Sequence, residues 1–159
     1  MPVNSGNKVK HSIAIYTDGS CHTQLKSGGW AAILFVEQQK IVLEGKDENT
    51  THHRMELTAV IRSLEYLNMN NLLQDPINIY SDSQYVVDLV KRKDRLAASS
   101  FLTKKLNSVR NVELVKELIS YMDKPNIKFI KIKAHQKPSN IAGILNREVD
   151  LLSRKKMRS

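Results

Sequence analysis

The sequence contains a single cysteine, Cys21. One cysteine excludes an internal disulfide and a zinc site built from several thiolates, and it is typical of proteins from a reducing compartment. Long apolar runs are also missing, and the polar first residues lack the apolar centre of a signal peptide. These absences favour a cytoplasmic protein that makes no use of a membrane.

Acidic residues are the minority among the charged ones, with 16 Asp and Glu against 25 Lys and Arg, which gives a formal charge of +9. Such an excess favours a polyanionic partner, most simply nucleic acid, although a generally basic surface would give the same count. The 159 residues, 41% of them hydrophobic, suffice for one domain with a sizeable core. Because the chain shows no repeat and no linker, we expect a flexible lead-in over residues 1–10 and a single domain over 11–159.

Apolar periodicity predicts a chain in which strands and helices alternate. Two-residue alternation and flanking turn residues predict strands at 13–18, 30–36, 40–45, 77–82 and 127–135. Helical spacing predicts helices at 52–69, 83–92, 112–122 and 146–156. The order of these elements indicates an α/β fold in which an antiparallel meander is followed by right-handed parallel crossovers. The lysines and arginines at the end of the chain are expected to form a solvated helix end or a frayed tail.

Four acidic residues occupy positions whose neighbours point into the core. Asp18 and Asp82 are predicted at the carboxyl ends of strands, and Glu56 and Asp150 lie in helices beside apolar residues. If the two strands are parallel neighbours, their ends meet at the edge where open α/β sheets bind ligands. Bare carboxylates are unfavourable there, whereas Mg²⁺ prefers oxygen ligands, and two ions roughly 4 Å apart suit phosphoryl transfer. Taken singly, each acid could instead be a turn residue, a helix cap or a surface charge.

A resemblance to a known family rests on five motifs in a fixed order: YTDGSC, TTHHRMEL, IYSDSQYV, KIKAH and NREVDLLSR. Together they are similar to the motifs of type 1 ribonuclease H, from Ile13 to Arg154. The resemblance implies a ribonuclease H-like fold, with a five-stranded mixed sheet (strands 1–3 antiparallel, strands 1, 4 and 5 parallel) and helices on both faces. It also implies an endonuclease that hydrolyses the RNA strand of RNA–DNA hybrids. The implied mechanism uses two Mg²⁺ ions, or Mn²⁺, and leaves 5′-phosphate and 3′-hydroxyl ends.

The same resemblance assigns roles to individual residues. The four acids Asp18, Glu56, Asp82 and Asp150 match catalytic residues that bind the metal ions. His135 matches a loop histidine that assists proton transfer or product release, a role that suits an unperturbed pKa near 6.5. The alternative for His135 is an ordinary solvent-exposed loop position.

Contacts to the nucleic acid are implied in three groups. Those near the RNA strand, besides Glu56, are Gly19, Ser20, Cys21, Gln24 and Gln84. Those that contact the DNA strand or shape its groove are Thr51, Arg54 and Asn111, with a structural salt bridge as the alternative for Arg54. A basic protrusion over 91–110 is implied to grip the hybrid through Lys91, Arg92, Lys93, Lys104 and Lys105. The alternative for the protrusion is a solvated helix face.

Some features depart from the family pattern. His52 and His53 stand where many members have asparagines, so a pH dependence could enter there. A transition-metal site at these histidines is disfavoured, because adjacent residues on a helix do not share a face. The loop from His135 to Asp150 is expected to be longer than in compact members. The rival interpretations are a non-catalytic hybrid-binding module and a related nuclease that acts on DNA, and we expect a monomer.

Overall fold

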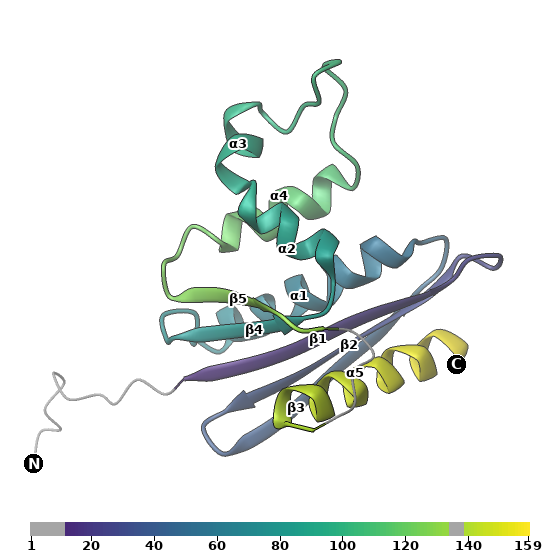
Figure 1. Cartoon of the computed structure of the whole chain (residues 1–159), viewed down its shortest axis with the longest axis vertical. Helices are drawn as coiled ribbons and strands as arrows, with labels where there is room; N and C mark the ends of the chain where they lie inside the picture. The colour runs from purple at the N-terminus through teal and green to yellow at the C-terminus, as the bar shows by residue number, and fades with distance from the viewer. Residues whose placement is uncertain (1–11, 134–138) are drawn as a thin grey trace, which may run out of the picture.

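A computed structural model describes residues 12–133 and 139–159 of the protein. Its strands are β1 (Ile13–His22), β2 (Ser27–Val36), β3 (Gln39–Asp47), β4 (Ile77–Ser81) and β5 (Ile127–Lys131). They form one five-stranded sheet in the order β3-β2-β1-β4-β5 (Figure 1). The β1–β2 and β2–β3 pairs are antiparallel, and the β1–β4 and β4–β5 pairs are parallel. The predicted mixed sheet is therefore confirmed.

Helices cover both faces of the sheet, as predicted. They are α1 (His52–Met69), α2 (Gln84–Lys91), α3 (Lys93–Ala98), α4 (Val112–Tyr121) and α5 (Ile141–Arg158). Helices α1 to α4 contribute to the larger hydrophobic core on one face, and α5 packs alone on the other face over β1 and β2 (Figure 1). None of the helices in the described ranges has the length and apolarity needed to cross a bilayer.

The strand β1 shows how the sequence supplies two cores at once. Ile13 and Ile15 are fully buried in the core under α1, whereas Ala14 and Tyr16 face the smaller core under α5. Successive side chains of a strand point to opposite faces, so a strand covered on both sides needs apolar residues at every position. This double burial fixes β1 at the centre of the sheet, and the residues that follow Tyr16 are held firmly in place.

Three boundaries differ from the sequence predictions by four residues or more. β1 does not end at Asp18 but continues to His22, because the following residues pair with the start of β2. β5 ends at Lys131 instead of reaching residue 135. α5 begins at Ile141 instead of residue 146, because the Asn140 side chain caps it by accepting from the Gly143 amide at 2.8 Å. Much of the predicted long loop before Asp150 is therefore helix.

The basic stretch after α2 contains a short helix, α3, that the periodicity did not indicate. It buries Leu96 and leaves most of its remaining residues exposed, so it carries almost no apolar repeat. Two sequence predictions concern residues outside the described ranges. These are the lead-in over 1–10 and His135, and both stay predictions.

Candidate active site

The two strand aspartates are brought together by the parallel pairing of β1 with β4. That pairing ends with Thr17 beside Ser81. The next residue along the chain is Asp18 after Thr17 and Asp82 after Ser81. Beyond this point β4 has ended, whereas β1 continues with β2 as its partner. The aspartates therefore meet at the carboxyl edge of β4, as expected, although Asp18 lies within a strand and not at its end.

Glycine at position 19 lets α1 approach β1 closely. A Cβ atom at Gly19 would overlap the backbone of Met55 and Glu56 in α1, and backbone atoms cannot move aside as a flexible side chain can. The absence of a side chain at Gly19 thus sets the distance between strand and helix. It brings the first turns of α1, with Glu56, beside the strand position that carries Asp18.

Glu56 is buried and both of its carboxylate oxygens are engaged. Its side chain is 8% exposed, and His52 Nε2 lies 2.6 Å from its Oε1. The Ser83 hydroxyl donates to its Oε2. Ser83 is itself held in place, because its oxygen accepts from the Val86 amide at 3.2 Å as the N-cap of α2. The negative charge of Glu56 is therefore compensated by local partners.

A second glycine positions α5 on the opposite face of the sheet. A Cβ atom at Gly29 would overlap the backbone of Ser153 and Met157. The hydroxyls of Ser20 and Ser153 lie 2.7 Å apart and are buried, which joins β1 to the same turn of α5. Asp150 lies one turn before this contact, so close packing at Gly29 determines where its carboxylate enters the site.

Asp150 is more open than Glu56 and has a different partner. Its side chain is 28% exposed, and the Arg154 Nε lies 3.0 Å from its Oδ1, one turn further along α5. Nearby, the Asn146 side-chain amide donates to Asp82 Oδ2 at 3.4 Å, which is a long hydrogen bond. The acids on the α5 side of the site are thus paired with groups from α5 itself.

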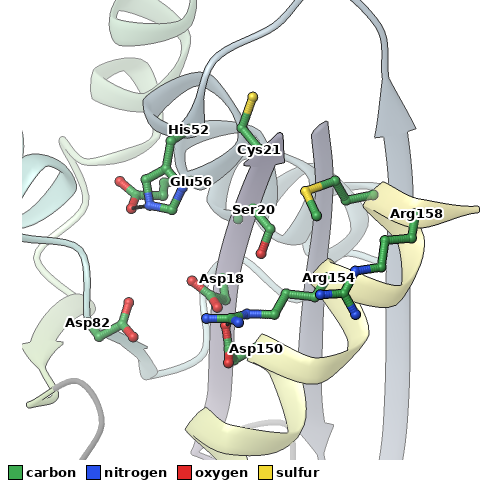
Figure 2. Close-up of a pocket in the computed structure, with 11 residues that line it drawn as sticks. Asp18, Ser20, Cys21, His52, Glu56, Asp82, Asp150, Arg154 and Arg158 are labelled. Atoms are coloured by element: carbon green, nitrogen blue, oxygen red, sulfur yellow. Dashed lines mark hydrogen bonds and ion pairs between the residues drawn. The ribbon is translucent and has the colours of Figure 1, made fainter. Parts of the chain in front are cut away.

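All four predicted acids line a single open pocket of about 380 Å³ (Figure 2). Its other lining residues are Gly19, Ser20, Cys21, His52, Arg154, Met157 and Arg158. Figure 2 shows the carboxylates of Asp18 and Asp150 close together, with Asp82 and Glu56 across the pocket. Three secondary-structure layers, namely α1, the sheet and α5, therefore present carboxylates to one cavity.

The carboxyl of Asp18 is the most strongly perturbed group of the pocket. Burial raises its pKa well above the ordinary value, and the negative charge of Asp82, a side-chain hydrogen bond with Asp150 and the charge of Asp150 raise the pKa further. A hydrogen bond from the Gly19 backbone amide acts in the opposite direction but is the smaller influence. An ionised Asp18 is consequently unfavourable in the protein alone, and a cation in the pocket would relieve this cost.

The chemistry of the pocket fits a hard divalent cation. Its donors are carboxylate oxygens, the ligands that Mg²⁺ and Mn²⁺ prefer, and it is open enough to admit a substrate phosphate. Within the described residues, no three His, Cys, Asp or Glu side chains are arranged so that they could hold a metal ion as they stand. Oxygens of Glu56 and Asp150 are turned to His52 and Arg154 instead.

Only some of the residues predicted to lie near the RNA strand belong to the pocket lining. Gly19, Ser20 and Cys21 line it directly. Gln24 is exposed in the turn between β1 and β2. Gln84 is exposed at the start of α2, where its side-chain amide donates to Asp88 at 2.7 Å. This hydrogen bond uses one of the two N–H donors of the Gln84 amide.

The residues predicted to contact the DNA strand meet at the ends of α1 and α4. Thr51 caps α1 by accepting from the Arg54 amide at 3.2 Å. The Arg54 guanidinium donates to Asn111 at 3.3 Å and lies 2.5 Å from a Glu113 oxygen. The salt bridge that was the alternative for Arg54 is therefore present. Asn111, with φ 56°, also donates to the Tyr85 hydroxyl at 3.1 Å.

The basic protrusion projects away from the sheet at the end of the molecule that carries α3 (Figure 1). Lys91, Arg92, Lys104 and Lys105 are exposed there. Lys93 differs, because its ammonium donates to the Met122 carbonyl at 2.8 Å and so ties α3 to the end of α4. The protrusion thus offers a cluster of exposed cationic side chains on a tethered base.

The two neighbouring histidines of α1 point in different directions, as expected. His52 pairs with Glu56, and this hydrogen bond is the main cause of its raised pKa. His53 stacks on the Tyr85 ring, with centroids 4.0 Å apart and an interplanar angle of 8°. A joint metal site at these two residues therefore has no geometric support.

Sequence reasoning missed the two arginines of the pocket. Of the two expectations for the end of the chain, the structure shows the helix end and not the frayed tail, because α5 continues to Arg158. That helix end also places Arg154 and Arg158 in the pocket lining. The spacing of four residues from Asp150 to Arg154 was a readable sign, since such residues are neighbours on a helix. Nothing in the sequence indicated that α5 packs closely enough for Arg158 to reach the same cavity.

The chain matches known proteins over nearly its whole length. A family model described as RNase H matches residues 10–158. A curated ribonuclease H of Wolbachia sp. subsp. Drosophila simulans is 37% identical over 147 residues, which are 92% of this chain and 95% of that protein. A ribonuclease H of Caldicellulosiruptor saccharolyticus is 36% identical over 127 residues, which are 77% of this chain and 83% of that protein.

Solved structures give the same result for the fold. LC11-RNase H1, isolated from compost by a metagenomic approach, was determined in complex with an RNA/DNA hybrid. It superposes with a TM-score of 0.66 at 20% identity, covering 92% of this chain and 96% of that one. At this identity the likeness shows a shared fold.

Proposed function

Because the chain belongs to the RNase H family, we propose that it is a metal-dependent endonuclease that hydrolyses the RNA strand of RNA–DNA hybrids. The observation that carries this proposal is the convergence of Asp18, Glu56, Asp82 and Asp150 on one open pocket. The relatives named ribonuclease H and the hybrid bound to LC11-RNase H1 support it. The presence of all four acids favours catalysis over a module that only binds hybrids.

The four carboxylates are the groups that would hold Mg²⁺, or Mn²⁺, in this pocket. Bound there, two such ions would supply the Lewis acidity for phosphodiester hydrolysis, with 5′-phosphate and 3′-hydroxyl ends as products. Asp18 is the central ligand of the proposal, since its carboxylate is the most destabilised without a cation. Gly19 and Ser20 present little bulk beside it and leave room for a nucleic-acid backbone. His135 is proposed to assist proton transfer or product release.

Recognition of the hybrid is proposed to divide between its two strands. The 2′-hydroxyl distinguishes RNA from DNA, so the groups around Gly19 to Cys21, together with Gln24 and Gln84, would read the RNA strand. Thr51, Arg54 and Asn111 would contact the DNA strand. The exposed cations of the basic protrusion would add affinity that falls with salt, through counterion release. Every pocket residue comes from one chain, so we propose a monomer as the active unit.

The test is cleavage of an end-labelled RNA–DNA hybrid in Mg²⁺, with EDTA as the first control. Duplex DNA, duplex RNA and single-stranded RNA are incubated in parallel, and Asp82→Asn is assayed for both cleavage and binding. We expect cuts in the RNA of the hybrid alone, their loss in EDTA, and retained binding by Asp82→Asn. An intact hybrid in both Mg²⁺ and Mn²⁺ would contradict the proposal, and cleavage of duplex DNA would point to a different nuclease.

A further inference from the structure

The pocket has a basic end that the four acids do not explain. Arg154 and Arg158 lie one turn apart on α5 and both line the cavity. Residues four apart on a helix share a face, so the two guanidiniums extend on the same side (Figure 2). An anionic ligand that enters the pocket therefore meets the carboxylates, Arg154 beside Asp150, and Arg158 one turn further along α5.

The two arginines differ in what they contact. Arg154 is committed to Asp150, with Nε 3.0 Å from the carboxylate. Arg158 is exposed, and within the described part of the chain no carboxylate lies within ion-pair distance of it. A guanidinium that has no protein partner and lines a pocket is available to a ligand with oxygen acceptors, and phosphate matches its planar fork of donors.

We propose that Arg158 binds a phosphate of the RNA strand, a few nucleotides away from the phosphate that is cleaved. The inference rests on the proposed function, because it takes the strand held by the acids to be the RNA. A helix rises about 1.5 Å per residue, so Arg158 lies about 12 Å further along α5 than Asp150. For a strand that follows α5, with one phosphate per about 3.4 Å of duplex axis, this distance spans roughly three phosphates.

A purely structural role is the competing explanation for Arg158. Cations in the last turn of a helix interact favourably with its dipole, and this turn also holds Lys155 and Lys156. Lys156 separates the two roles, because its ammonium lies 4.0 Å from Glu44 on β3 and not in the pocket. Replacement of either residue by glutamine removes one positive charge from the same helix end, so Lys156→Gln is a matched control.

The experiment measures binding of a short RNA–DNA hybrid in EDTA, where no metal-dependent cleavage occurs, over a range of salt concentrations. We expect Arg158→Gln to bind about fivefold more weakly at 0.1 M salt and to lower the salt-dependence slope by about one. Lys156→Gln should stay within about twofold of the original protein, and Arg158→Lys should recover part of the lost affinity. Equal losses in Arg158→Gln and Lys156→Gln would overturn the proposal, as would a changed unfolding temperature with unchanged binding.

A second measurement assigns the strand. Single uncharged methylphosphonate linkages are placed in turn along the RNA or the DNA of the hybrid, and binding to the original protein and to Arg158→Gln is compared. One uncharged RNA linkage should weaken binding of the original protein but not binding of Arg158→Gln, because this variant has already lost the contact to that phosphate. Coupling to a DNA linkage would overturn the strand assignment. Cleavage in Mg²⁺ is scored separately, so a failure of the proposed function is seen independently of Arg158.

Discussion

Glu56 and Asp150 are presented to the same pocket from opposite faces of the sheet, and their surroundings differ. Glu56 is almost fully buried and is paired with His52 and the Ser83 hydroxyl. Asp150 is 28% exposed, and its charge, like that of Asp82, raises the pKa of Asp18. The pocket therefore contains a repelling trio (Asp18, Asp82, Asp150), in which the acidic neighbours disfavour an ionised Asp18 although Asp150 is itself paired with Arg154. The fourth acid, Glu56, is the buried, compensated acid. Carboxylates that share one function can therefore change the free energy of unfolding in opposite directions.

The largest expected effects come from making these acids neutral. Asp18→Asn and Glu56→Gln should each reduce cleavage at least about a hundredfold, because both remove charge from the proposed metal site. Their effects on stability should be opposite. Asp18→Asn relieves repulsion and is expected to raise the free energy of unfolding by about 1 kcal/mol. Glu56→Gln weakens the buried hydrogen bond from Ser83 and the more exposed one with His52, and is expected to lower the free energy of unfolding by about 1–2 kcal/mol.

Urea unfolding at several pH values tests whether Asp18→Asn and Glu56→Gln change the free energy of unfolding in opposite directions. The pKa of Asp18 is raised in the folded protein, so stability should fall as pH rises from about 4 through that raised pKa. Asp18→Asn should lack this decline. Asp123→Asn, an exposed position after α4, makes the same chemical change and should alter neither cleavage nor stability. Equal destabilisation by Asp18→Asn and Glu56→Gln would remove the distinction between the trio and the compensated acid.

The next largest effect concerns the glycine that brings α1 to the sheet. Gly19→Ala places a Cβ against the backbone of Met55 and Glu56 and is expected to cost about 2–3 kcal/mol of stability, with loss of cleavage. Gly28→Ala is the comparison, because the atoms nearest to its Cβ would be side-chain atoms of Thr50 and Met55 and not backbone atoms. Thermal unfolding and cleavage of both variants are measured together. A similar cost at the two positions would show that backbone contact with α1 is not what holds Glu56 in place.

Contacts set by strand order or by helical spacing could be predicted from this sequence, whereas contacts between packed elements could not. The meeting of Asp18 and Asp82 follows from strand order, and the pairing of Asp150 with Arg154 follows from helical spacing. Packing between elements is different, because it depends on which atoms collide. Gly29 decides how closely α5 approaches, and hence whether Arg158 reaches the pocket, but a glycine in a strand gives no sign of its distant neighbour. Likewise, Asn140 as a helix cap was recognisable only once α5 was seen to begin there.

A smaller effect is expected when divalent cations bind without substrate. Mg²⁺ should raise the unfolding temperature by roughly 3–6 °C at tenfold excess over its Kd, where the linkage free energy is about 1.4 kcal/mol. Most of this rise should come from the relief of repulsion within the repelling trio. Asp18→Asn should therefore lose the rise, and Glu56→Gln should retain a large part of it. NaCl at equal ionic strength controls for screening. If Glu56→Gln abolishes the rise as fully as Asp18→Asn does, the two classes of acid act as a single unit towards the cation.

The smallest expected effect is the pH dependence of the pair between His52 and Glu56. The pKa of His52 is raised chiefly by the hydrogen bond to Glu56 and also by the charge of Asp82, while burial and the charge of Arg154 oppose the rise. The stabilising pair should therefore be complete below the unfolded pKa of about 6.5 and should be lost as pH rises through the folded pKa. His52→Asn should lower the free energy of unfolding by less than about 1 kcal/mol at pH values near 6, because the imidazole is 55% exposed and solvent weakens the pair.

Well above the folded pKa of His52, the difference between His52→Asn and the original protein should shrink towards zero. Chemical denaturation across the pH range measures it, and His53→Asn is the control, because it removes a ring contact with Tyr85 and no carboxylate partner. A His52→Asn deficit that stays constant with pH would mean that Glu56 is held by packing and Ser83 alone. In that case His52 would not stabilise the charge of Glu56. Glu56 would then differ from Asp150, which is paired with a permanently charged arginine, only in how deeply it is buried.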